Sequence, residues 1–201
     1  MNTSDWVEEV VPLRDHVLSV MRPRDASDLV SEEDFAGNEF LPYWAELWAA
    51  GRALAETVVV SSLRSASVLE IGCGLALPSF AAALAGGRVT ASDWSSSALS
   101  AVSSNAALNE LSVSVMELDW FSPPSDLPYF DLVLAADVLY EERNVAALLD
   151  LLPGLGRSVL LADPGRETSG RFFADAGRDW HVRATGHPAI PNGAVHRLRR
   201  R

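Results

Sequence analysis

From residue 67 onward, short runs of apolar residues alternate with longer segments in which apolar residues recur at helical spacing. This alternation is typical of a parallel β-sheet that is covered by helices. The segment 186–193, which contains Pro188 and Pro191, joins the last two strands and is too short for a crossover helix. The fold class is therefore α/β, with a seven-stranded, mostly parallel sheet, a C-terminal antiparallel hairpin and helices on both faces. The predicted strands are residues 67–71, 88–92, 113–117, 131–136, 157–162, 180–185 and 193–198.

Helices are expected between these strands. Residues 75–84 are apolar and rich in alanine, which favours a helix. A second helix is predicted to run through residues 98–109, because Asp93 and Ser95 just before it are residue types that cap helix N-termini. A third helix is expected at residues 141–152, after the fourth strand of the sheet.

One long helix is predicted ahead of the sheet, at residues 43–62. It would begin after Pro42, and Trp44, Leu47 and Trp48 would recur on one of its faces. Most pairs of this kind, four residues apart on a helix, are simply part of the core. We therefore expect at least one of the two tryptophans to be a core residue.

Composition fits one folded domain of ordinary size. The chain has 201 residues, of which 48% are hydrophobic and 21% are charged. The acidic start suggests no secretory signal, and the longest apolar runs are too short to span a bilayer. Cys73 is the only cysteine, which excludes an intramolecular disulfide and makes a cytoplasmic location the default expectation.

The net charge is −11, and residues 1–40 carry about two thirds of the excess. This segment is expected to be an N-terminal extension, in which residues 7–13 and 17–21 could form a β-hairpin, ahead of a main domain at 41–201. Such a field repels a nucleic acid backbone, so nucleic acid is not expected as a partner and a basic protein surface or a cation is favoured. Against three arginines, the segment has ten acids: Asp5, Glu8, Glu9, Asp15, Asp25, Asp28, Glu32, Glu33, Asp34 and Glu39.

The most informative short motif is Glu70-Ile71-Gly72-Cys73-Gly74, which lies between a predicted strand and a predicted helix. Glycines suit such a turn because a Cβ would hinder positive φ and keep the backbone from approaching a ligand closely. Asp93 ends the next strand, where an acid can accept hydrogen bonds from ribose hydroxyls. The pattern indicates a site for a nucleoside cofactor.

The missing third glycine of this loop argues against a dinucleotide. The dinucleotide fingerprint is G-x-G-x-x-G, and here Leu77 occupies the third position and Pro78 follows it. S-adenosylmethionine has no pyrophosphate and carries a sulfonium and an ammonium group, so an acid beside the loop suits it. Glu70 supplies that acid. We therefore favour S-adenosylmethionine over a nicotinamide dinucleotide.

Further candidate residues follow other strands of the sheet. After the third strand, Asp119 could accept from an adenine amino group and Trp120 could stack on the ring; an exposed acid and a core tryptophan explain them equally well. Asp137 and Tyr140 follow the fourth strand, whose carboxyl end faces the ligand crevice of an open α/β sheet. The alternative for Asp137 is a helix cap. Asp163 follows the fifth strand; it either faces the ligand site or only stabilises the turn there.

Five segments together resemble one family, the seven-β-strand, Rossmann-like methyltransferases that depend on S-adenosylmethionine. Among these, P-Y-W-A-x-x-W-x-x-G-x-A-L-A and D-P-G-R are most similar to the protein-lysine methyltransferases, the group that includes the electron-transfer-flavoprotein β-subunit enzyme and its bacterial relatives. The resemblance covers about residues 40–170. The five segments are residues 41–55, 70–74, 119–120, 137–140 and 163–166.

The resemblance implies an S-adenosylmethionine-dependent enzyme that methylates a lysine of a protein partner. Asp137 would orient the acceptor amine as a catalytic residue, and Tyr140 would wall the channel that leads to it. No metal site is expected, because the four histidines are scattered along the chain, and we expect a monomer. Together with the residues inferred above, the expected cofactor-binding set is Trp48, Glu70, Gly72, Cys73, Gly74, Asp93, Trp94, Asp119, Trp120 and Ala136.

Three alternatives stay open at this point. A small-molecule N-methyltransferase would use a similar acid and tyrosine for a ring nitrogen or an amine. A nucleotide-dependent oxidoreductase is weakened by the missing third glycine, and a non-catalytic donor-binding module would have no use for the D-x-x-Y segment. A hydrolase with a nucleophile elbow is excluded, since the chain contains no G-x-S-x-G.

Overall fold

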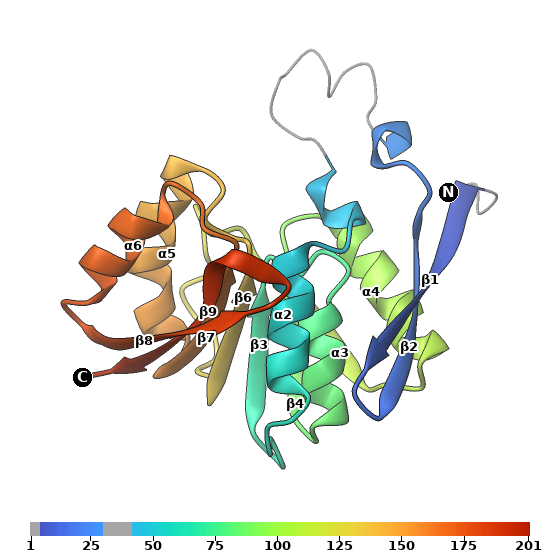
Figure 1. Cartoon of the computed structure of the whole chain (residues 1–201), viewed down its shortest axis with the longest axis horizontal. Helices are drawn as coiled ribbons and strands as arrows, with labels where there is room; N and C mark the ends of the chain where they lie inside the picture. Colours follow the sequence, from blue (N-terminus) through green and yellow to red (C-terminus); the bar gives the residue numbers. More distant parts are fainter. Residues whose placement is uncertain (1–4, 30–41) are drawn as a thin grey trace.

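The computed structural model describes residues 5–29 and 42–201 (Figure 1). Its main element is a seven-stranded sheet with the strand order β5-β4-β3-β6-β7-β9-β8. Strand β9 runs antiparallel to both β7 and β8, while the other neighbouring pairs are parallel. The predicted fold class, with its C-terminal antiparallel hairpin, is confirmed. The strands are β3 (Ser67–Ile71), β4 (Arg88–Asp93), β5 (Val113–Glu117), β6 (Leu132–Ala136), β7 (Ser158–Asp163), β8 (Trp180–His187) and β9 (Ile190–Arg200).

Helices cover both faces of the sheet, because its buried strands are apolar on both sides. In β3, Val68 packs into a cluster with α2, α3 and α4, whereas Leu69 and Ile71 pack with α5 and α6 on the other face. None of the helices in the described part of the chain has the length and hydropathy needed to cross a bilayer. The helices are α2 (Ala49–Val58), α3 (Leu77–Leu84), α4 (Ser96–Leu108), α5 (Glu142–Leu155) and α6 (Ser169–Ala176).

An antiparallel hairpin precedes the sheet and packs beside α4 (Figure 1). Two asparagines bind the second strand of the hairpin: Asn105 within α4, and Asn109, the C-cap of that helix. The Asn109 side chain accepts from Ser19 N at 2.9 Å and donates to Ser19 O at 2.7 Å. The Asn105 side chain binds Met21 in the same way, at 2.7 and 2.9 Å. The two strands are β1 (Trp6–Leu13) and β2 (His16–Pro23), which span the residues where the sequence predicts a hairpin.

The single helix predicted at residues 43–62 is wrong. The chain forms a short 3-10 turn, η3 (Tyr43–Ala45), is extended at Glu46, and enters α2 only at Ala49. Trp48 is the N-cap of α2, and its indole Nε1 donates to the Tyr43 carbonyl at 2.8 Å. The two tryptophans therefore do not share a helix face. The bent segment lies against the glycine loop, where the Trp44 carbonyl oxygen is close to Gly74.

Candidate functional site

A cavity of about 680 Å³ opens at the carboxyl ends of β3, β4 and β6. This is the edge at which open α/β sheets bind ligands. The bent segment at residues 43–48 forms one wall of the cavity. The structure brings all twelve expected site residues to it: Trp48, Glu70, Gly72, Cys73, Gly74, Asp93, Trp94, Asp119, Trp120, Ala136, Asp137 and Tyr140.

The two glycines of the loop are required by close packing as well as by conformation. Gly72 and Gly74 have φ values of +57° and +51°, which residues with a Cβ rarely adopt. A Cβ on Gly72 would lie 2.6 Å from Cζ2 of Trp120, and one on Gly74 would lie 3.1 Å from the Trp44 carbonyl oxygen. A side chain at either position would therefore strain the backbone; at Gly72 it would also overlap the Trp120 indole, and at Gly74 it would crowd the Trp44 carbonyl.

Asp93 is anchored by the backbone and still faces the cavity. Its Oδ2 accepts from Gly74 N and its Oδ1 accepts from Ser95 N, both at 3.0 Å. Burial raises the pKa of this carboxyl, which is only 5% exposed. An ionised carboxylate has about four acceptor positions, so two hydrogen bonds leave capacity for ligand hydroxyls.

Glu70 differs from the expectation of a carboxylate offered to the loop. The residue is buried, and its Oε2 accepts from both Ser79 N at 2.8 Å and Ser79 Oγ at 2.5 Å. Ser79 lies in the first turn of α3, where orphan N–H groups favour an acidic partner. Burial nevertheless raises the pKa of Glu70 to about 8, so the group is mostly protonated at neutral pH.

Cys73 lies between the two glycines and is buried. Burial, followed by the nearby Asp93, raises the pKa of its thiol well above the ordinary value. A thiol that stays protonated is a poor nucleophile. Cys73 is therefore a small packing residue of the loop.

Asp137 directly follows β6, and its backbone bonds to the neighbouring strand β7. Its φ is +55°, its backbone N donates to Ala162 O at 2.9 Å, and its side chain is 8% exposed. Arg166 holds the carboxylate with two parallel bonds, Nε to Oδ1 and Nη2 to Oδ2, each of 2.8 Å. The N-cap of α5 is Glu141, so the alternative role of Asp137 as a helix cap is wrong.

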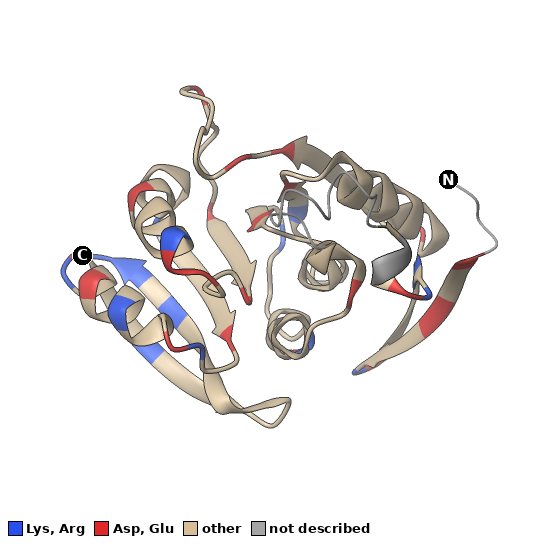
Figure 2. Cartoon of the chain, turned by 90° about the horizontal axis from the view of Figure 1, so that it is seen from above, with Lys and Arg blue, Asp and Glu red and all other residues tan. Residues whose placement is uncertain are grey.

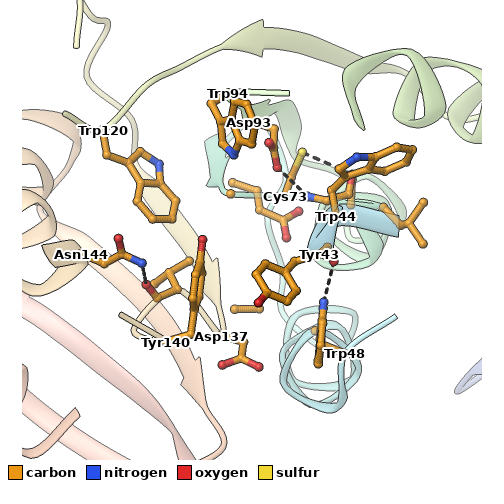
Figure 3. A pocket seen from close by; sticks show the side chains of 18 of the residues that line it. Tyr43, Trp44, Trp48, Cys73, Asp93, Trp94, Trp120, Asp137, Tyr140 and Asn144 are labelled. Carbon is orange, nitrogen blue, oxygen red and sulfur yellow. Dashed lines mark hydrogen bonds between the residues drawn. The ribbon is translucent and has the colours of Figure 1, made fainter. Parts of the chain in front are cut away.

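Three aromatic side chains form one side of the cavity mouth (Figure 3). The rings of Tyr43 and Trp48 are 6.2 Å apart, and those of Tyr43 and Tyr140 are 5.7 Å apart. All three side chains are between 38% and 47% exposed. Tyr43 was not among the expected site residues, because the sequence pattern assigned it to the first turn of a helix.

Trp94 and Trp120 lie toward the opposite end of the cavity, on the side of Asp93 (Figure 3). Trp94 is 51% exposed and Trp120 is half-buried. Asp119 is exposed, and its Oδ1 accepts from Phe121 N at 2.9 Å, so it shapes the turn after β5. The cavity therefore has two distinct parts. One contains Asp93 with Trp94 and Trp120, and the other contains Asp137 with the three aromatic side chains.

Acids dominate the described residues that line this cavity. The two cations are Arg143 and Arg166, which bind Glu141 and Asp137. Among the described residues, no group of His, Cys, Asp and Glu side chains is arranged to hold a metal ion. A cationic ligand therefore suits this cavity better than an anionic one. The acids are Glu46, Glu70, Asp93, Glu117, Asp119, Asp137 and Glu141.

Comparisons with known proteins give consistent results. A family model described as "Lysine methyltransferase" matches residues 43–174. The electron transfer flavoprotein beta subunit lysine methyltransferase of Danio rerio is 35% identical over 132 residues, which are 62% of this chain and 51% of that relative. Protein N-lysine methyltransferase METTL21A of Mus musculus is 34% identical over 139 residues, 59% of this chain and 62% of that protein. The chain thus spans about half the length of the first curated relatives it matches.

A solved structure with the same fold is the magnesium protoporphyrin IX methyltransferase (ChlM) from Synechocystis PCC 6803 with bound SAM. The two structures superpose with a TM-score of 0.61 at 19% sequence identity, over 75% of this chain and 80% of that chain. Identity at this level reports the fold alone. The expected seven-strand methyltransferase architecture agrees with this comparison.

Proposed function

Because the chain belongs to the lysine methyltransferase family, we propose that it transfers a methyl group from S-adenosylmethionine to a lysine side chain of a protein. The observation that carries this proposal is the two-part acidic cavity, with Asp93 at one end and Asp137 at the other. The expected location in the cytoplasm and the monomeric state are part of the same proposal. The lone, buried Cys73 supports that location, since it offers no intramolecular disulfide.

The chemistry of the loop end suits the methyl donor. Asp93 would accept from the two ribose hydroxyls, because its anchored oxygens keep free acceptor positions. Trp94 and Trp120 offer indole faces for the adenine ring. A cationic donor beside Glu70 would favour the ionised form of that acid and so lower its raised pKa. When bound, the donor supplies an electrophilic methyl group.

At the other end, the residues suit an acceptor amine. A lysine side chain has an ordinary pKa near 10.4 and must lose a proton before its nitrogen has a free lone pair. Asp137 would hold the incoming ammonium by a charge-assisted hydrogen bond, and Tyr43, Trp48 and Tyr140 would surround its stem with aromatic faces. The proton of the ammonium would pass to water, and alignment of the nitrogen with the donor methyl group is then the main contribution of the protein.

A labelling experiment tests this proposal. The purified protein is incubated with tritiated S-adenosylmethionine and, in separate arms, with purified electron transfer flavoprotein beta subunit, with desalted host proteins, and with the small-molecule fraction of the same lysate. The sequence contains no lysine, so labelled lysine cannot come from the enzyme itself. Labelled lysine in the beta subunit or in the host proteins would support the proposal.

The other outcomes decide between the alternatives. Label only in the small-molecule arm would move us to a small-molecule N-methyltransferase, which the acid and tyrosine of the site suit equally well. A melting temperature that rises with a nicotinamide dinucleotide and not with S-adenosylmethionine would exclude the methyltransferase proposal. Binding to the native state stabilises it by about 2.7 kcal/mol at a hundredfold excess over Kd, so a real ligand gives a clear shift.

A further inference from the structure

The loop after β7 delivers Arg166 to the cavity in a fixed shape. Asp163 Oδ1 accepts from the backbone N of Gly165 at 2.8 Å and of Arg166 at 3.0 Å. Gly165 has a φ of +98°, and a Cβ there would lie 2.5 Å from the carbonyl oxygen of Asn192 in β9. The loop is therefore fixed by hydrogen bonds to the Asp163 carboxylate and by close packing against β9.

The contact that Arg166 makes fixes more than the position of Asp137. Two parallel bonds from one planar guanidinium set the plane of the carboxylate as well as its distance. The Asp137 carboxylate is 8% exposed, whereas the Arg166 side chain is 40% exposed at the cavity wall. Without Arg166, a shielded carboxylate would lose its partner and could rotate to find another.

We propose that Arg166 is a positioning residue, which holds the Asp137 carboxylate in the one orientation that presents it to the acceptor amine. This inference rests on the proposed function, since it concerns the acceptor end of the same cavity. It assigns a role to the last residue of the D-P-G-R segment. Arg166 acts through Asp137 and does not itself bind the donor.

In a simpler role, Arg166 would merely occupy the place of the substrate ammonium. A competitor of that kind would weaken acceptor binding, so its removal would lower KM for the acceptor and leave kcat unchanged. A positioning residue has the opposite signature. Its removal lowers kcat, because a misplacement of about 1 Å can cost about a hundredfold in rate.

The test compares Arg166→Ala, Arg166→Lys and the control Arg171→Ala with the wild-type protein. Arg171 binds Glu142 in an exposed ion pair outside the cavity, so its removal should leave activity unchanged. All variants are first checked for folding by thermal melting and for binding of S-adenosylhomocysteine by calorimetry. Donor affinity should stay within about twofold of the wild type, since Arg166 acts at the other end of the cavity.

Methyl transfer to the acceptor protein is then measured. We expect kcat to fall about 10- to 100-fold in Arg166→Ala, and Arg166→Lys to recover only part of it, because an ammonium cannot make the two parallel bonds. Millimolar guanidinium ion should raise the rate of Arg166→Ala and leave that of Arg171→Ala unchanged. A merely structural role would give no such rescue.

Two results would overturn the inference while leaving the proposed function intact: an active wild type with an unchanged kcat in Arg166→Ala, or a lowered acceptor KM in that variant. Loss of donor binding in Arg166→Lys, with normal melting, would also overturn it, because Arg166 would then belong to the donor site. A wild-type protein that labels no acceptor protein would instead refute the proposed function, and the premise of this inference with it.

Discussion

Replacing Glu70 with glutamine should change how the stability of this protein depends on pH. Glu70 is buried against α3, and burial raises its pKa from 4.5 to about 8. Glutamine keeps a carbonyl oxygen that can accept from Ser79 N and Ser79 Oγ, and it does not titrate. The variant therefore removes one proton equilibrium and conserves the shape of the site.

The sign of the effect follows from the two pKa values. Below pH 4.5 the acid is protonated in the folded and in the unfolded chain, so its contribution to stability is fully present. Between pH 4.5 and about 8 only the unfolded chain has lost the proton, and the free energy of unfolding falls as pH rises. Each pH unit is worth about 1.4 kcal/mol, so wild type should lose up to about 5 kcal/mol relative to Glu70→Gln across this window.

Urea unfolding at a series of pH values between 5 and 8 measures the effect. The informative quantity is the difference in unfolding free energy between wild type and Glu70→Gln, because titrating groups that do not interact with Glu70 cancel in it. Asp131→Asn is a matched control, since Asp131 also accepts from the backbone N and the hydroxyl of one serine, Ser67, but is exposed. Those hydrogen bonds lower the pKa of Asp131, so its difference curve should be flat above pH 5 and change only in more acidic solution.

A flat difference curve for Glu70→Gln between pH 5 and 8 would refute this reasoning. It would mean that Glu70 is ionised in the folded protein throughout that range, held by the first turn of α3 strongly enough to outweigh burial. A constant offset alone carries no information, because an amide can fit the site slightly worse at every pH.

Three other predictions follow from the site. Asp93→Ala should weaken donor binding by about 1.5 to 3 kcal/mol in calorimetry, whereas Asp137→Ala should lower turnover with donor affinity nearly unchanged; equal loss of donor binding in both would mean that Asp137 is misassigned. Gly72→Ala should abolish donor binding in calorimetry, since its Cβ would lie 2.6 Å from Cζ2 of Trp120, and an unchanged donor affinity would contradict the loop geometry. If the acids of residues 1–40 recruit a basic protein, methylation of that protein should fall steeply as salt reduces the screening length from about 10 Å to about 3 Å, while donor binding changes little; salt-independent turnover would contradict it.

The described acids of the N-terminal segment include those of β1, which lie at one side of the molecule. Red acidic segments lie along β1, on the side of the molecule opposite the blue segments of β8 and β9 (Figure 2). Glu9 forms ion pairs with Arg22 and with Arg52 of α2, which lower its pKa. Its charge is therefore already balanced within the protein. Four of the ten acids, Glu32, Glu33, Asp34 and Glu39, lie outside the described residues. Recruitment by this segment remains a proposal.

The sheet could be predicted from the sequence because each strand is a short apolar run of its own. Val68 and Leu69 are both buried, on opposite faces, so a continuous apolar stretch between turn residues was a sufficient signal. The loop glycines were equally readable, because a tight strand-to-helix turn needs positive φ, and Gly72 and Gly74 have φ values of +57° and +51°. These features depend on neighbours in sequence or on one strand-to-helix turn.

The features that could not be predicted depend on the direction of a side chain or on partners distant in sequence. The segment at Tyr43–Trp48 has helical spacing, but the extended conformation at Glu46 brings it to the glycine loop. Glu70 was placed correctly at the loop, yet its pairing with Ser79 requires the direction of its side chain. Arg166 and Asp137 are 29 residues apart, and only the adjacent ends of β6 and β7 bring them together.

The asparagine contacts of α4 also affect what the edge of β2 can offer to another chain. Four residues of a helix rise about 6 Å, and two residues of a strand span about 6.6 Å, so side chains at Asn105 and Asn109 match the spacing of Ser19 and Met21. An exposed strand edge is normally a template on which another chain can add a strand. Here the backbone N–H and C=O groups of Ser19 and Met21 in β2 are already bonded to side-chain amides of the same chain. A neighbouring molecule that approached this edge would find no free backbone groups at these two residues with which to extend the sheet.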